Sequence, residues 1–70
     1  MDITVIASDL AFPEGPAIDP QGRLHWVEIA GQRIAALEPD GTVVTFAETG
    51  GGPNGCAFDA EGWLYVCNNG

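Results

Sequence analysis

The sequence predicts an all-β fold that comprises about one and a half blades of a β-propeller. The first observation is a repeat: residues 12–30 align with residues 52–70 at an offset of 40, with six identical pairs among nineteen. The second is a turn pattern with a leading acid and a closing glycine, at residues 19–22, 38–41 and 59–62. The third is that no segment longer than eight residues shows helical periodicity. A repeat of about 40 residues, built from short strands and turns, is typical of propeller blades.

The first predicted strand, residues 3–7, precedes the repeat and has no pairing partner nearby in the sequence. We expect it to close the propeller by joining the last blade. The next four strands flank the first two turns, at residues 15–18, 23–28, 33–38 and 42–46. Together they form a complete first blade over residues 15–46. The run WVEI, residues 26–29, is apolar on both faces apart from Glu28, which suits a blade packed between two others.

The second copy of the repeat starts another blade over residues 54–70, with strands at residues 55–58 and 63–67. Residues 47–53 link the two blades, because seven extended residues reach about 23 Å and the crossing needs only roughly 15 Å. We therefore expect residues 1–70 to be the N-terminal part of a longer protein, which needs the remaining blades for a closed fold. A chain of this size buries only about 60% of its extended surface, so the isolated fragment is expected to be poorly stable and inactive.

The composition excludes several classes of partner. The sequence contains ten acidic residues and only two basic ones, Arg23 and Arg33, which gives a net charge of −8 at pH 7. Such a surface repels nucleic acid and anionic membranes and attracts cations. The N-terminus lacks the features of a secretory signal, and no apolar run reaches membrane-spanning length. Cys56 and Cys67 make no disulfide framework, so we expect free, inert, buried thiols and a cytoplasmic location.

The histidine, the two tryptophans and Glu28 are expected to have structural rather than catalytic roles. His25 is the sole histidine, and without a second histidine or paired cysteines it is expected to pack inside a blade rather than bind a transition metal. Trp26 and Trp63 are expected to fill the space between blades. Glu28 ends a strand and can form a salt bridge with Arg33 across the next turn, with no catalytic part assigned to it.

The third turn also predicts a pairing register for its hairpin. If the turn occupies residues 59–62, Cys56 lies opposite Tyr65 and Cys67 lies opposite Asn54. The two cysteines are then not cross-strand partners.

The repeat places an oxygen-bearing side chain at the same position in each copy, namely Glu14 and Asn54. Each follows a proline and precedes a glycine, just before the predicted innermost strand at one mouth of the central channel. Carboxylate and amide oxygens are ligands that calcium and similar hard cations take. Capping of local turns explains the same two residues equally well, and the spacing alone leaves both interpretations open.

Two stretches carry a resemblance to a known family, LAFPEGPAIDPQGRLHWVEI and GGPNGCAFDAEGWLYVCNNG. They resemble the start of the regucalcin/gluconolactonase family, also called senescence marker proteins. The resemblance implies a six-bladed propeller with one divalent metal ion in its channel, which hydrolyses lactones and often sugar lactones. It also implies that Glu14, the glutamate of the EGP element, is the first metal ligand.

The resemblance is weaker for the asparagines. The family's asparagine ligands generally lie more than one blade beyond the glutamate, whereas Asn54 is one blade on. Asn54 is therefore expected to line the substrate pocket, and Asn68 and Asn69 either do the same or are polar turn residues. The other ligands and the general base are expected beyond this chain, so no catalytic residue is assigned. Oxygen donors favour calcium, with zinc or another divalent ion left open.

These observations favour a metal-dependent lactonase that acts on small sugar-type lactones. Two alternatives remain: a non-catalytic propeller that binds a ligand or protein, and a related propeller hydrolase that acts on phosphoesters. A blade repeat does not distinguish them, because the fold does not determine the function.

Overall fold

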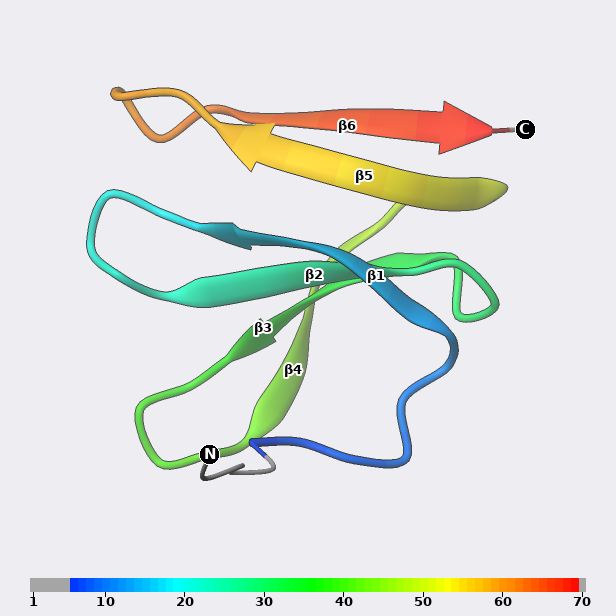
Figure 1. Ribbon diagram of the computed structural model, residues 1–70, viewed down its shortest axis with the longest axis horizontal. Coiled ribbons are helices and arrows are strands. Elements are labelled where there is room, and N and C mark those ends of the chain that lie inside the picture. Colours follow the sequence, from blue (N-terminus) through cyan, green and yellow to red (C-terminus); the bar gives the residue numbers. More distant parts are fainter. Residues whose placement is uncertain (1–5, 70) are drawn as a thin grey trace, which may run out of the picture.

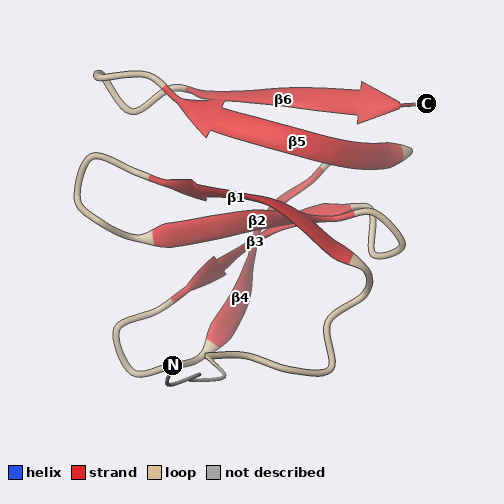
Figure 2. Ribbon diagram, viewed as in Figure 1, coloured by secondary structure: helices blue, strands red, loops and turns tan. Residues whose placement is uncertain are grey.

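The computed structural model describes residues 6–69, and all regular structure in this range is β-strand (Figures 1 and 2). The strands are β1 (Pro13–Ile18), β2 (Leu24–Glu28), β3 (Arg33–Leu37), β4 (Val43–Glu48), β5 (Gly52–Phe58) and β6 (Leu64–Asn69). Within the described range no helix is long and apolar enough to cross a membrane. The prediction of an all-β fold is confirmed.

The strands form two antiparallel sheets. The first has the order β1-β2-β3-β4, and the second is the hairpin β5-β6. Strand β5 packs against β1 and β2, so that the hairpin lies over one face of the first sheet (Figure 1). The first sheet spans residues 13–48 rather than the expected 15–46, and only residues 49–51 link it to β5. Ile6 and Ala7 lie in no strand, and the rest of the predicted strand at 3–7 lies outside the described residues.

The three acid-to-glycine turns have a common geometry. The amides of Gly22, Gly41 and Gly62 donate to the carbonyl oxygens of Asp19, Glu38 and Asp59 at 2.9, 2.9 and 3.1 Å. The three glycines have φ values of 86°, 89° and 90°, a left-handed conformation that glycine adopts without steric cost. Each turn is therefore a type I turn followed by a glycine bulge, which suits the right-handed twist of a hairpin.

The glycine bulge corrects the predicted register of the third hairpin. The amide of Asp59 donates to the carbonyl oxygen of Trp63 at 3.0 Å, so the loop contains one residue more than a turn closed at Gly62. As a result Cys56 lies opposite Val66 and Cys67 lies opposite Gly55, and the predicted pairing of these cysteines was wrong by one residue. The two thiols are free, as expected.

The core lies between the two sheets. His25 pairs with Ala36 and Val27 pairs with Ile34, which places all four side chains on one face of the first sheet. They are fully buried, and the His25 ring meets Phe58 of β5 edge-on at a centroid distance of 4.7 Å. The prediction that His25 packs inside the fold is confirmed.

The opposite face of β2 carries Trp26 and Glu28, which are also buried. The amide of Ala11 donates to the Glu28 carboxylate, so the segment before β1 covers this face. Both faces of β2 are thus covered, as its apolar sequence predicted.

The outer face of the second sheet has no cover among the described residues. Trp63, expected to fill the space between blades, is 69% exposed, and Cys67, expected to be buried, is also exposed. Both expectations are wrong for this chain, because no segment of residues 6–69 packs on the outer face of this hairpin. Cys56 faces the first sheet instead, and burial raises the pKa of its thiol, which disfavours the reactive thiolate.

Candidate functional site

The sequence-predicted site residues gather at one end of the two sheets. Glu14 and Asn54 lie near the starts of β1 and β5, while Asn68 and Asn69 end β6. Because β5 and β6 are antiparallel, the start of one strand and the end of the other meet at the same edge. The three glycine turns lie at the opposite end (Figure 1). The chain therefore presents one carboxylate and three amide side chains on one side of the molecule.

Glu14 and Asn54 lie inside their strands, not before them as expected, and each sits at an irregularity in the pairing. Glu14 is opposite Val27, but the next regular pair is Ala17 with His25, so β1 bulges in between. In β5 the bulge falls between Pro53 and Gly55, at Asn54 itself. A bulge re-aims neighbouring side chains and is over-represented beside active sites. The repeat seen in the sequence is thus also a repeat of this local distortion.

The glycines that follow these two residues set the spacing of the two sheets. A Cβ atom added to Gly15 would lie 2.9 Å from the Cα atom of Gly55 and 3.5 Å from the carbonyl oxygen of Asn54. Gly15 also has a φ of +49°, in the left-handed region that disfavours side chains. The backbones of β1 and β5 can approach this closely because Gly15 lacks a side chain, whereas a Cβ atom added to Gly55 would meet nothing within 4 Å. This contact brings the backbones beside Glu14 and Asn54 together.

The Glu14 side chain is exposed and makes no hydrogen bond or ion pair with any residue in the range 6–69. Glu14 also borders a hollow of about 260 Å³ between the segment before β1 and the first sheet. The hollow is lined mainly by apolar residues: Ile6, Ala7, Leu10, Pro13, Pro16, Leu24 and Trp26. A carboxylate whose lone pairs are not used within the chain can serve as a cation ligand.

The asparagines differ in their contacts. Asn54 is exposed. The Asn68 side-chain amide donates to the carbonyl oxygen of Thr49 at 3.4 Å and so ties β6 to the link between the sheets. Asn69 lies opposite Gly52. Both residues belong to strand β6, not to a loop after it as expected, because they pair with Pro53 and Gly52 beyond the bulge at Asn54.

A complete metal site is not found within the described part of the chain. No three histidine, cysteine, aspartate or glutamate side chains come together among residues 6–69. Glu14 is the one acidic side chain among the four predicted site residues, and the hard-cation interpretation depends on oxygens from elsewhere.

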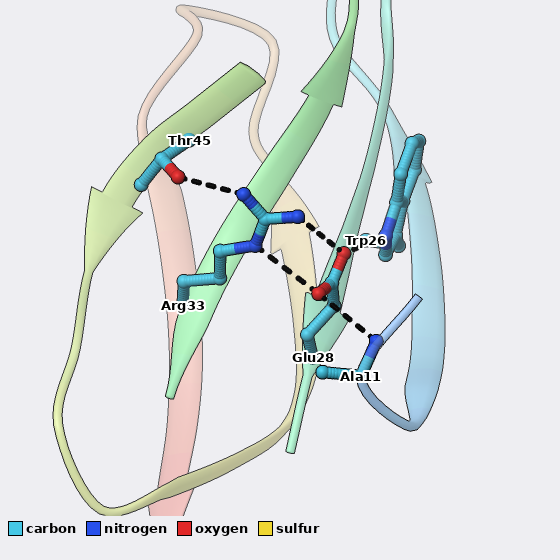
Figure 3. A network of polar contacts seen from close by, with 5 residues as sticks. All are labelled: Ala11, Trp26, Glu28, Arg33 and Thr45. Atoms are coloured by element: carbon cyan, nitrogen blue, oxygen red, sulfur yellow. Dashed lines mark hydrogen bonds and ion pairs between the residues drawn. The ribbon is translucent and has the colours of Figure 1, made fainter. Parts of the chain in front are cut away.

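The sequence predicted the ion pair of Glu28 with Arg33 but not the other hydrogen bonds of this buried carboxylate (Figure 3). Its side chain is 2% exposed and forms the expected ion pair with Arg33, at 3.0 Å. Trp26 Nε1 also donates to it at 2.9 Å, and the Ala11 amide donates at 3.2 Å. The sequence signals of this network were a single acid in an apolar run and an arginine across the next turn; the contacts with Trp26 and Ala11 had none.

The environment of Glu28 acts on its pKa in two directions. Burial raises the pKa, but the hydrogen bonds from Arg33, Trp26 and Ala11 and the charge of Arg33 outweigh burial and leave it below its ordinary value of 4.5. The carboxylate is therefore ionised at neutral pH even though it is almost fully buried.

Comparisons with known proteins agree with this architecture. A family model described as the SMP-30/gluconolactonase/LRE-like region matches residues 12–70. Among solved structures, a gluconolactonase from Xanthomonas campestris superimposes with a TM-score of 0.80 and 31% sequence identity. The alignment covers 90% of this chain but only 22% of that protein. No curated protein matches this chain.

Proposed function

The chain belongs to the SMP-30/gluconolactonase/LRE-like family, and from this premise we propose that it is the N-terminal part of a metal-dependent lactonase with a six-bladed propeller. In this proposal the first sheet is the first blade and the β5-β6 hairpin begins the second. The next blade covers the exposed face around Trp63, and the closing blade covers the hollow beside Glu14. The isolated chain is then inactive, because most of the channel is missing.

The observation that supports a metal site is the placement of Glu14. Its carboxylate is exposed and forms no hydrogen bond or ion pair with residues 6–69, and it stands next to the close contact of Gly15 with Gly55. Oxygen donors of this kind fit a hard divalent cation, so we propose calcium, with zinc or another divalent ion as the alternative to be tested. The remaining oxygen ligands come from later blades.

The residues of this chain then have distinct tasks. Glu14 holds the ion and supplies negative charge to it. Asn54, Asn68 and Asn69 lie at the same end and offer amide groups that can hydrogen-bond the hydroxyl groups of a sugar lactone. When bound, a divalent ion polarises an ester carbonyl and stabilises the oxyanion that develops on attack by water. The general base is assigned to a residue beyond this chain.

The test needs a complete propeller, by which we mean a protein in which this chain is joined to the remaining blades. These blades are either encoded with the chain or supplied by a chimera in which residues 6–70, which include Ala11, replace the matching part of the Xanthomonas gluconolactonase. We expect it to hydrolyse glucono-lactone, and we expect a chelator to lower the rate at least about tenfold, because the carbonyl loses its Lewis acid. Adding calcium back restores the rate.

Other outcomes separate the alternatives. The variant Glu14→Gln is expected to be as slow as the chelated protein and not to respond to added calcium. A rate unaffected by both the chelator and Glu14→Gln would contradict the metal-dependent mechanism. Hydrolysis of phosphoesters but not of lactones would favour the related hydrolase, and hydrolysis of neither would favour a binding module.

A further inference from the structure

We propose that Glu28 is a positioning residue for Glu14: its buried carboxylate fixes the turn that precedes β1 and thereby the direction in which the Glu14 carboxylate points. The inference rests on the proposed function, because it concerns the same metal site. It assigns a task to a residue that lies on a different strand from the ligand and does not itself touch the ion.

The first step is that both carboxylate oxygens of Glu28 accept two hydrogen bonds each. Its Oε1 atom accepts hydrogen bonds from Arg33 Nε at 3.1 Å and from the Ala11 amide at 3.2 Å. Its Oε2 atom accepts from Arg33 at 3.0 Å and from Trp26 Nε1 at 2.9 Å. Arg33 is held in turn by Thr45 of β4, whose hydroxyl oxygen accepts from it at 2.7 Å (Figure 3). The carboxylate therefore has a fixed position in the first sheet.

The second step leads from Glu28 to the residues just before Glu14. Pro13 pairs with Glu28, and the amide of Ile29 donates to the carbonyl oxygen of Phe12 at 3.1 Å. With the bond from Ala11, residues 11–13 are thus attached to the end of β2 at three successive positions. Gly31 packs tightly against the same residues, since a Cβ atom there would lie 3.3 Å from both the Ala11 Cβ and a Glu28 carboxylate oxygen.

The third step is that this turn needs such support. Phe12 has a φ of 62°, a left-handed conformation that bulky residues rarely adopt. It also precedes a proline, which restricts residues to extended conformations. Backbone strain of this kind persists only where the surroundings over-determine it, and it is concentrated at functional sites. Here the contacts of Glu28 with Ala11 and of Ile29 with Phe12 hold the strained backbone, two residues before the candidate ligand Glu14.

Stability alone does not explain the network. A buried ion pair is often no more stabilising than well-packed apolar residues of the same size, so its presence is weak evidence of a stabilising role. Its attachment to the strained turn beside Glu14 is the feature that a positioning role explains. Outer residues that orient ligands commonly change metal affinity by about 10- to 100-fold.

The experiment measures calcium affinity in the complete propeller by titration calorimetry. Glu28→Gln removes the charge. Ala11→Pro removes the amide hydrogen that donates to Glu28, fixes the local φ, and leaves the side chains of Glu28 and Arg33 unchanged. Both variants are expected to raise the calcium dissociation constant about tenfold or more. The matched controls are Glu61→Gln and Ala60→Pro, which make the same substitutions in the exposed third turn and are expected to change the constant less than about twofold.

Terbium luminescence gives a second readout that a purely structural role would not change. A misdirected Glu14 leaves a coordination position to water, so the luminescence lifetime of bound terbium is expected to shorten in Glu28→Gln and Ala11→Pro but not in the controls. Unchanged calcium affinity and lifetime, with only a lower melting temperature, would show that Glu28 is merely structural and would leave the proposed function standing. If Glu28→Gln does not fold, Ala11→Pro decides.

The failure of the proposed function gives a different pattern. In that case the unmodified propeller binds no calcium, or Glu14→Gln binds it as tightly as the unmodified protein. Either result overturns the metal site and the positioning role together. Loss of calcium binding in Glu14→Gln combined with unchanged binding in both Glu28→Gln and Ala11→Pro overturns the positioning role alone.

Discussion

Replacing Gly15 by alanine is expected to lower the free energy of unfolding of the complete propeller by about 2–5 kcal/mol. Two effects combine. The left-handed φ of +49° costs an alanine about 1–2 kcal/mol. The new methyl group would also lie 2.9 Å from the Cα atom of Gly55, and overpacking against a rigid backbone costs about 1–3 kcal/mol more. Denaturant unfolding, followed by tryptophan fluorescence, measures the difference.

Gly22→Ala and Gly41→Ala are matched controls for this change. Both positions have left-handed φ values, +86° and +89°, but nothing lies within 4 Å of an added Cβ atom. They are expected to show the conformational cost of about 1–2 kcal/mol without the overlap. If all three variants lose the same stability, the contact between β1 and β5 does not limit the spacing of the sheets.

Replacing Glu28 by glutamine is expected to cost about 2–4 kcal/mol at neutral pH, because it leaves the partly buried Arg33 guanidinium without its counter-charge. The control is Glu38→Gln, which breaks the ion pair with Arg23. The side chains of that pair are 33% and 37% exposed, so the loss is expected to stay below about 1 kcal/mol.

The difference between Glu28 and its glutamine variant is also expected to depend on pH. The folded protein lowers the pKa of Glu28 below its ordinary value of 4.5, so folding favours the ionised form. The stabilisation is therefore fully present above pH 4.5 and is lost as the pH falls through the lower pKa of the folded state. A pH-independent difference in unfolding free energy would contradict this account of the network.

Much of this fold follows from local sequence signals. The acid-to-glycine turns predicted the hairpins because a left-handed glycine such as Gly62 is nearly obligatory in a bulged type I turn. The apolar run Trp26–Val27 predicted a strand covered on both faces, and the structure buries both residues. These features depend on neighbours in the chain, which the sequence shows directly.

Other features depend on how distant segments meet. The one-residue error at Cys56 arose because the glycine bulge adds a residue that a count of turn positions does not show. Trp63 is exposed because no other part of residues 6–69 packs on its face of the hairpin, which a local pattern does not show. Ala11, for its part, meets Glu28 only after the chain has passed through β1 and β2, so no local pattern identifies that contact.

In the candidate site, too, some features could be predicted from the sequence and others could not. The repeat identified Glu14 and Asn54 as equivalent positions, because an offset of 40 places both between a proline and a glycine. The close approach of Gly15 to Gly55 and the support that Glu28 gives to the strained Phe12 required coordinates. The sequence therefore indicated Glu14 as the candidate ligand, and the structure showed which contacts surround it.

The most direct measurement of the central claim is a crystal structure of the complete propeller grown with calcium, with terbium substituted to locate the ion by anomalous scattering. We expect an ion in the channel, with a Glu14 carboxylate oxygen about 2.3–2.6 Å from it when calcium is bound. A channel without an ion, and a Glu14 side chain directed into bulk solvent, would contradict the claim.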